Sequence, residues 1–289
     1  MGRLVEVVAS LVGLGIRTER LARRAAGHGA ATTAVNWHDG GAGEPVVLLN
    51  GFGASGLVWP RSWVQQLERH HRVLRVDNRG TGWSHRTPAP FTIADCADDV
   101  AAILDQCGLP SATVLGMSMG GMIAQEFGIR HPDRVARLIL VSTIPPAPAH
   151  VPTLISAAAI SATLSGTRSD DRFHAEGLAR LYLNTSSPKF TASNELIAEL
   201  ADQLRARPTP MTKVIQQARA IAAWRDSERL LTLRVPTAIV VGQDDPVVKP
   251  INSHALAALV PEGRLHVLAG VGHMVPWEAP NRLTALING

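Results

Sequence analysis

The chain has 289 residues, of which 46% are hydrophobic and 18% charged, and this balance excludes disordered and coiled-coil proteins. Residues 1–30 carry +3 of the formal charge of +4, so the rest of the chain is nearly neutral. Because nucleic-acid binding requires cations clustered on one face, no nucleic-acid partner is expected for the main body. The length suits a single α/β domain with an insertion.

The first 30 residues combine an apolar stretch with a cluster of arginines. Five apolar side chains recur at the spacing of one helix face: Leu4, Val8, Leu11, Val12 and Ile16. Glu6 interrupts this short stretch and no clear cleavage site follows it, so we predict neither a signal peptide nor a transmembrane helix. We predict an amphipathic helical extension over residues 1–30 that packs on the body, on a twin subunit or on a membrane surface.

Beyond residue 30, short apolar runs alternate with longer helical ones, which indicates βαβ units and a mainly parallel sheet. The expected strands are residues 32–37, 45–49, 73–77, 112–115, 137–142, 237–241 and 264–268. The expected helices are residues 61–70, 93–107, 119–131, 251–259 and 277–288. The glycine-rich segment 40–43 is predicted to be a turn between the first two strands, because it lacks the following helix that a phosphate-binding loop needs.

This alternation stops after the fifth expected strand and resumes with the sixth. No convincing strand lies between them, and prolines are frequent there: Pro145, Pro146, Pro148, Pro152, Pro188, Pro208 and Pro210. We therefore predict a helical lid over residues 145–232, inserted into a core of residues 31–144 and 233–289. Residues 151–164 are almost free of charge, which predicts a lid helix that is buried all round or lines an apolar cleft.

The only two cysteines, Cys96 and Cys107, fall in one expected helix. The helix separates them by about 16 Å, which is too far for a disulfide, and both are expected to be buried. A chain without disulfides is typical of a reducing compartment, so a cytoplasmic location is predicted.

Residues 116–121 read Gly-Met-Ser-Met-Gly-Gly between an apolar run and an expected helix. The pattern GxSxG in this setting is typical of a sharp strand-to-helix turn that raises its serine into a cleft, so Ser118 is the predicted nucleophile. Side chains at Gly116 or Gly120 are expected to collide with neighbouring strands. The helix that follows directs its N-terminal amides toward the serine oxygen.

A serine hydroxyl is a poor nucleophile at neutral pH, so it needs a base, and the base needs a carboxylate that fixes its tautomer. Of the eleven histidines, His273 alone lies in a glycine-rich loop, residues 270–273, directly after an expected strand. Two aspartates follow another expected strand. Asp245 is preferred because Pro246 holds the turn, and Asp244 is the alternative.

Five motifs resemble those of the α/β-hydrolase fold family, in its lid-bearing serine esterase, lipase and carbon–carbon hydrolase branch. They are residues 48–53, 77–84, 116–120, 242–246 and 270–273. The order serine, aspartate, histidine is also that of this family, and its acid lies three residues after the glycine, as Asp245 does. The resemblance implies a mainly parallel, doubly wound α/β sheet of about eight strands with an inserted helical lid.

The resemblance also implies that the backbone N–H groups of Phe52 and Met119 form an oxyanion hole. Asn50 stands where the family usually has histidine. Because the donors are main-chain groups, the hole is expected to survive with different supporting hydrogen bonds. Arg79 is interpreted as structural, and Ser118 disfavours the dehalogenases and epoxide hydrolases of this fold, which use aspartate at the elbow.

Together these features predict a serine hydrolase that cleaves a carboxylic ester, thioester or lactone through an acyl-enzyme. The apolar lid indicates a hydrophobic small-molecule substrate with an acyl or ring-bearing group. Carbon–carbon bond hydrolysis, acyl transfer or cyclisation, and a non-catalytic binding protein on the same fold are the alternatives. No metal-binding or dinucleotide-binding motif occurs, so neither a metal nor another cofactor is expected.

Overall fold

The structure is a computed structural model that describes residues 35–150, 176–177, 179, 183 and 193–289. All of these residues belong to one compact unit, residues 33–289. The predicted extension over residues 1–30 and the predicted lid helix over residues 151–164 lie outside the described residues. Among the described residues, no helix has both the length and the apolar character needed to cross a bilayer.

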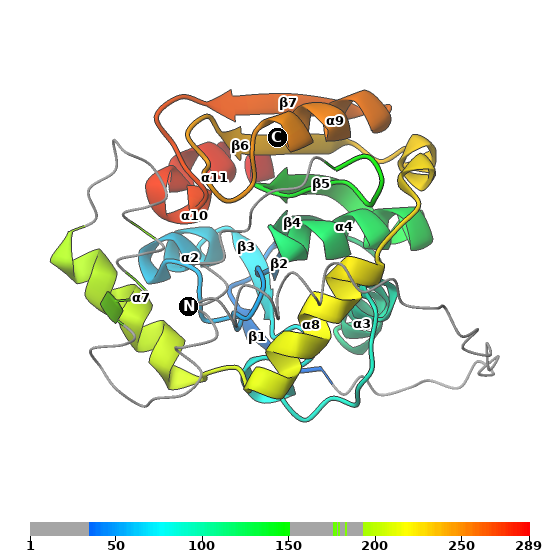
Figure 1. Ribbon diagram of the computed structural model, residues 1–289. Coiled ribbons are helices and arrows are strands. Elements are labelled where there is room, and N and C mark those ends of the chain that lie inside the picture. The colour runs from blue at the N-terminus through cyan, green and yellow to red at the C-terminus, as the bar shows by residue number, and fades with distance from the viewer. Residues whose placement is uncertain (1–34, 151–175, 178, 180–182, 184–192) are drawn as a thin grey trace, which may run out of the picture. The chain divides into compact units, whose positions relative to one another are not determined.

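Seven strands form one sheet, in the spatial order β1-β3-β2-β4-β5-β6-β7 (Figure 1). β1 runs antiparallel to β3, and every other neighbouring pair is parallel. The strands are Trp37–Gly40 (β1), Glu44–Leu49 (β2), His71–Val76 (β3), Ala112–Met117 (β4), Val135–Val141 (β5), Thr237–Gly242 (β6) and Gly263–Leu268 (β7). The predicted mainly parallel α/β class is confirmed, with seven strands in the described residues rather than about eight.

The first strand of the described residues begins at the last residue of the strand predicted for residues 32–37, of which residues 32–34 lie outside the described part of the chain. The sequence places it at residues 32–37, because that run is rich in apolar and β-branched residues, whereas β1 covers Trp37–Gly40. β1 is at the edge of the sheet as described, and none of its residues is fully buried, so the polar His38 and Asp39 are compatible with a strand there. Main-chain pairing with β3 has therefore decided the position, which side-chain propensity alone does not indicate.

Helices flank the sheet on both faces. Those outside the predicted lid are α2 (Arg61–Glu68), α3 (Ile93–Gln106), α4 (Met119–Arg130), α9 (Ile251–Leu259), α10 (Val275–Glu278) and α11 (Pro280–Asn288), with short 3-10 turns at η1 (Gly82–Ser84) and η2 (Pro132–Arg134). The single helix predicted for residues 277–288 is instead two helices. Ala279 leaves the helical region, with φ −141° and ψ 50°, because the residue before a proline is disfavoured in the α conformation.

Alternating residues of the strands supply the two halves of the core. In β2, Val47 and Leu49 face the cluster that includes side chains of α3, α4 and α9. Val46 and Leu48 face the opposite cluster, with side chains of α2 and α11. This period of two follows from strand geometry, and it makes β2 apolar at four successive positions because both faces are covered.

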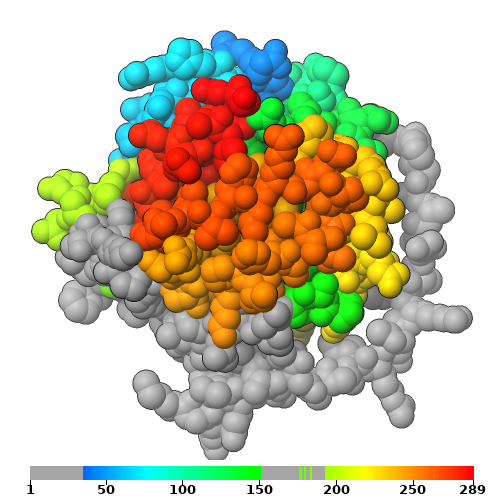
Figure 2. Space-filling model, turned by 90° about the horizontal axis from the view of Figure 1, so that it is seen from above, coloured from blue at the N-terminus to red at the C-terminus, as the bar shows by residue number. Residues whose placement is uncertain are grey.

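β7 is the other edge strand, and Figure 2 looks onto it: β7 and α9, in orange, lie at the surface beside the red C-terminal helices.

Between β5 and β6 the described residues form α7 (Asn194–Ala206), α8 (Met211–Ala223) and η3 (Ser227–Thr232). They contain no strand, only an isolated bridge between Ala147 and Arg225. Both helices contact the core through side chains: Gln203 of α7 donates to the carbonyl of Trp59 at 3.0 Å, and α8 contacts the loops described below. Helices therefore occupy the described part of the segment where a lid is predicted, while the boundaries 145–232 stay a prediction.

The two cysteines are both free thiols. Cys96 is buried in α3, and this burial raises the pKa of its thiol. Cys107 is only partly buried, because it forms the C-terminal cap of α3 rather than lying within the helix, so the expectation of two buried cysteines is wrong for Cys107.

Candidate active site

Ser118 sits between the last residue of β4 and the first residue of α4. Its backbone has φ 55° and ψ −118°, a conformation that costs a residue with a side chain about 1–3 kcal/mol. A Cβ atom added to Gly120 would lie 1.9 Å from the carbonyl oxygen of Leu49 in β2. One added to Gly116 would lie 2.2 Å from the carbonyl oxygen of Gly120. A side chain at Gly120 would thus collide with a neighbouring strand, as predicted, whereas a side chain at Gly116 would collide with the start of α4.

The strained turn is held by hydrogen bonds to the next strand. The N–H of Ser118 donates to the carbonyl of Val141 at 2.9 Å, which continues the β4–β5 ladder. Thr143 Oγ1, just beyond β5, donates to the carbonyl of Ser118 at 2.7 Å. α4 is buried at ten of its twelve positions, so the elbow rests on a helix that is itself enclosed by the core. These contacts fix the position from which the Ser118 hydroxyl leaves the sheet.

Asp245 and His273 meet in a buried hydrogen-bonded pair. Nδ1 of His273 lies 2.9 Å from Oδ2 and 3.2 Å from Oδ1 of Asp245. Oδ1 also accepts the backbone N–H groups of Val247 and Val248, both at 2.8 Å. The side chains of both members of the pair are less than one tenth exposed. Asp244 has no such contact with His273 in the described structure.

This pairing determines which ring nitrogen of His273 carries the proton. A carboxylate can only accept, so Nδ1 must donate, and in the neutral imidazole Nε2 is then a free acceptor. An acceptor at Nε2 is what a general base for a hydroxyl requires. Two backbone amides position the carboxylate, and both of its oxygens lie within hydrogen-bond distance of Nδ1.

Topology brings Ser118 to the same edge of the sheet as this pair. Ser118 follows β4, Asp245 follows β6 and His273 follows β7, and these strands are parallel members of one sheet. Their carboxyl ends therefore share one edge, where α/β proteins bind ligands. In the described residues no hydrogen bond joins Ser118 Oγ to His273. Such bonds are often long in unliganded enzymes and shorten when substrate binds.

Residues 51–54 form a tight turn beside the serine. The N–H of Ala54 donates to the carbonyl of Gly51 at 3.4 Å, and Gly53 has φ 71°, as the third residue of a type II turn requires. A Cβ atom added to Gly51 would lie 3.4 Å from Cβ and 3.9 Å from Oγ of Ser118. Phe52, one of the two expected oxyanion donors, therefore belongs to a turn that lies directly beside Ser118.

The other expected donor, Met119, is the first residue of α4. Its N–H belongs to the first turn of the helix, where amides have no acceptor within the helix, and the positive end of the helix dipole lies there. Asn50, the departure from the family pattern, is buried and donates its side-chain N–H to the carbonyl of Ala54. Its own carbonyl accepts Nδ2 of Asn78 at 3.0 Å. Amide side chains thus provide the supporting hydrogen bonds of this turn.

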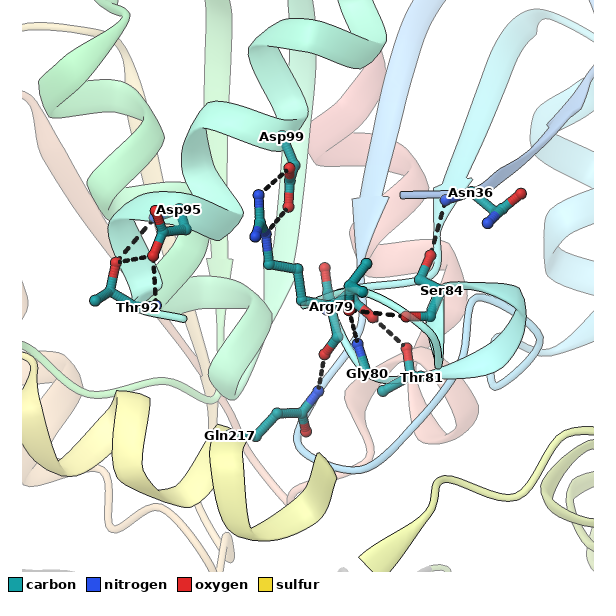
Figure 3. Close-up of polar contacts among 11 residues, drawn as sticks. Asn36, Arg79, Gly80, Thr81, Ser84, Thr92, Asp95, Asp99 and Gln217 are labelled. Carbon is teal, nitrogen blue, oxygen red and sulfur yellow. Dashed lines mark hydrogen bonds and ion pairs between the residues drawn. The ribbon is translucent and has the colours of Figure 1, made fainter. Parts of the chain in front are cut away.

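The segment around Arg79 braces this edge of the sheet. Asp77 is fully buried and accepts the N–H groups of Gly56 at 2.7 Å and Trp83 at 2.9 Å. The guanidinium of Arg79 forms two hydrogen bonds to Asp99 of α3, at 2.6 and 2.8 Å (Figure 3). This bidentate pair agrees with the structural interpretation of Arg79, because it engages the planar end of the side chain.

The backbone amides that hold Asp245 are a feature that the sequence prediction missed. The signal was available, since an aspartate commonly accepts the N–H groups two and three residues later, and Val247 and Val248 occupy those positions. For metals, the described residues contain no cluster of three or more histidine, cysteine, aspartate or glutamate side chains arranged as ligands.

A family model described as the alpha/beta hydrolase fold matches residues 44–280. The chain belongs to the α/β-hydrolase fold family. The match includes the elbow, the turn at 51–54 and the loops that carry Asp245 and His273. Since its relatives are named as hydrolases and esterases, the chain is an enzyme of this family.

Three relatives illustrate the range of activities around this α/β-hydrolase. A Caulobacter protein named as the carbamate hydrolase RutD is 30% identical, over 84% of this chain and 89% of its own. The 2-hydroxy-6-oxo-2,4-heptadienoate hydrolase of Pseudomonas putida is 28% identical, over 88% and 91%. Among solved structures, a thermophilic esterase from Thermogutta terrifontis aligns with a TM-score of 0.70 and 28% identity, over 88% and 91%. The family is therefore clear, while its members differ in the bond they cleave.

Proposed function

We propose that this α/β-hydrolase cleaves a carboxylic ester, thioester or lactone, with Ser118 as nucleophile, His273 as general base and acid, and Asp245 as the carboxylate that orients it. The observation that carries the proposal is the buried contact between His273 Nδ1 and Asp245 at 2.9 Å, on the sheet edge where strained Ser118 emerges. A carboxylate–imidazole pair in this setting is what a serine needs to become nucleophilic.

In the first half-reaction Ser118 Oγ attacks the carbonyl carbon while His273 Nε2 takes the hydroxyl proton. The carbonyl oxygen becomes an oxyanion, which the N–H groups of Phe52 and Met119 stabilise. The tetrahedral centre then collapses: the bond to the leaving oxygen or sulfur breaks, and the leaving group takes the proton from Nε2. Asp245 stabilises the imidazolium that exists between these two proton transfers.

In the second half-reaction water replaces the leaving group. His273 takes a proton from water, the hydroxide oxygen attacks the acyl carbon, and the acid product leaves as Ser118 regains its proton. The acyl group is proposed to be hydrophobic or ring-bearing. The nearly uncharged composition of residues 151–164 in the predicted lid supports this.

The decisive experiment replaces Ser118 with alanine and measures turnover of a chromogenic short-chain ester. We expect a loss of at least about three orders of magnitude in kcat, because the acyl-enzyme no longer forms. Ser142→Ala is the matched control, because this fully buried serine also follows a parallel strand, β5, at the same sheet edge. Normal turnover in Ser118→Ala, or loss of turnover only in Ser142→Ala, would show that Ser118 is not the nucleophile.

Carbon–carbon bond hydrolysis is the second candidate, favoured by the similarity to the Pseudomonas putida hydrolase over most of both chains. Purified enzyme should be offered an ester, a carbamate and a vinylogous diketone in parallel. A kcat/KM for the diketone at least tenfold above that for the best ester would replace ester hydrolysis as the proposed reaction. Adding an alcohol or amine acceptor tests acyl transfer, because a transferase forms the new ester or amide faster than the free acid.

A further inference from the structure

Two side chains from the segment between β5 and β6 form hydrogen bonds to the backbone of the turn at residues 51–54, beside Ser118. Oε1 of Gln217, on α8, accepts the N–H of Gly53 at 2.9 Å. Thr209, just before α8, donates its hydroxyl to the carbonyl of the same glycine at 2.8 Å. Gln217 is completely buried and Thr209 is 3% exposed. One residue of the turn is thus held through both of its backbone groups by side chains more than 150 positions away.

The amide of Gln217 has a second partner that fixes its orientation. Its Nε2 donates to the carbonyl of Arg79 at 3.0 Å (Figure 3). Turning the amide over would set its NH2 group against the N–H of Gly53 and its oxygen against the carbonyl of Arg79. Both contacts would then be repulsive, so only one arrangement satisfies these buried groups.

The Arg79 end of this bridge is itself rigid. Arg79 is paired with Asp99 of α3, and its neighbour Gly80 donates its N–H to the carbonyl of Ser84 at 3.1 Å. One helical turn before Gln217, Nζ of Lys213 donates to the carbonyl of Thr87 at 2.5 Å. α8 therefore has a fixed anchor on the braced 77–87 segment, and from there Gln217 reaches the more exposed turn at residues 51–54.

These two hydrogen bonds affect the conformation of the turn because of the position of Gly53 within it. The peptide between Phe52 and Gly53 is the central peptide, whose orientation distinguishes type II from type I turns. Gln217 binds the N–H of that peptide, and Thr209 binds the carbonyl of the next one. The backbone angles that follow the Phe52 N–H are therefore fixed by α8 and its leading segment, and the turn's own 3.4 Å hydrogen bond is long by comparison.

We propose that Gln217, assisted by Thr209, is a positioning residue that holds the Phe52 amide in place for the oxyanion. This inference rests on the proposed function, since the oxyanion arises only if Ser118 attacks a carbonyl. Neither side chain takes part in bond making. Their loss leaves the nucleophile and its base intact but loosens one of two donors, which weakens binding of the transition state more than binding of the substrate.

The test uses the full-length chain with Gln217→Met and Thr209→Val, two replacements of similar volume that remove the polar contacts. Active sites are counted by fluorophosphonate labelling, so that kcat refers to folded, reactive enzyme. We expect kcat per labelled site to fall about 10- to 100-fold in Gln217→Met and somewhat less in Thr209→Val, while KM changes less than about threefold. The affinity for a boronic acid, which mimics the tetrahedral oxyanion, should fall by the same factor as kcat/KM.

Two further variants separate positioning from general stability. Thr209→Ser keeps the hydroxyl and should restore most of the kcat lost in Thr209→Val. Gln216→Leu changes the adjacent, partly buried glutamine of α8, for which the described structure records no hydrogen bond, and should behave as wild type. A lower melting temperature and fewer labelled sites, with unchanged kcat per site in both Gln217→Met and Thr209→Val, would overturn the inference and leave the proposed function intact. Turnover that does not depend on Ser118 would overturn both.

Discussion

At the scale of single residues, Asp245 shows how a backbone can specify a protonation state. Its Oδ1 is occupied by two amide donors, Val247 and Val248, and its Oδ2 is directed to Nδ1 of His273. The two oxygens are therefore not equivalent. A side chain that replaces Asp245 is expected to keep an acceptor atom on the N–H groups of Val247 and Val248. Its other terminal atom then faces Nδ1 of His273.

This asymmetry leads to a specific prediction for Asp245→Asn. The asparagine oxygen should remain with the two backbone N–H groups, which places its NH2 group against Nδ1 of His273. Nδ1 must then accept, the proton moves to Nε2, and the base is lost. We expect kcat to fall by about four orders of magnitude with little change in the melting temperature, measured by ester turnover and calorimetry.

Asp244→Asn is the matched control for that variant. Asp244 is adjacent in sequence and partly exposed, and its side chain has no contact with His273 in the described structure. Its turnover should stay within about twofold of wild type. If Asp244→Asn is the variant that loses activity, the alternative acid named from the sequence is the correct one.

At the scale of secondary-structure elements, an ion cluster joins α3 to the end of α4. Asp98 of α3 accepts two hydrogen bonds from Arg130, at 2.7 and 2.9 Å, and one from His131 at 2.8 Å. Partial burial alone would raise the pKa of Asp98, but these hydrogen bonds outweigh it and lower the pKa to about 2. The carboxylate is therefore more stable in the folded protein than in the unfolded chain.

The sign of this shift sets a pH window for stability. Because the folded-state pKa lies below the ordinary value of 3.8, the cluster stabilises the fold above about pH 4, and this contribution disappears as the pH falls toward 2. Asp98→Asn should lower the melting temperature by at most about 3 °C at pH 7, since partly exposed pairs contribute under about 1 kcal/mol. The difference from wild type should shrink between pH 4 and pH 2.

Asp133→Asn, an exposed carboxylate that forms no ion pair with any described residue, provides the reference for this titration. Its melting temperature should track wild type at every pH. A constant difference between Asp98→Asn and wild type from pH 7 down to pH 2 would contradict the coupling of Asp98 to Arg130 and His131.

At the scale of the whole molecule, every residue of the proposed site lies at position 52 or later. The family match begins at residue 44, well after the predicted amphipathic extension. We therefore predict that a chain lacking residues 1–32 keeps its ester turnover per labelled site within about twofold. If residues 1–30 mediate an external contact, the same deletion should change the oligomeric state or abolish sedimentation with anionic vesicles.

Light scattering and vesicle sedimentation of the two chains decide between the external contacts named for residues 1–30. A dimer that becomes a monomer identifies the twin subunit, and loss of vesicle binding at low salt identifies the membrane surface. A large loss of turnover in the shortened chain would instead show that these residues support the catalytic unit.

Much of the site could be predicted from the sequence because its determinants are local. The GxSxG turn, the aspartate after one strand and the histidine after another are each recognised within a few residues, and glycine spacing reflects contacts such as that of Gly120 with Leu49. The family match and the mainly parallel sheet agree with that local pattern. Local sequence signals predict a strand less well where main-chain pairing determines its position. In β1, polar residues form a strand because they pair with β3.

By itself, then, the sequence determined the α/β class, the chain order of the proposed catalytic side chains and the strained turn at Ser118, because these depend on short-range chemistry and on the alternation of apolar residues. Only the tertiary structure decided which aspartate meets His273, how the Asp245 oxygens are shared, and that Gln217 holds a turn 164 positions earlier. Such contacts join segments that are remote along the chain, and no periodicity or propensity within a short window encodes which of them will meet.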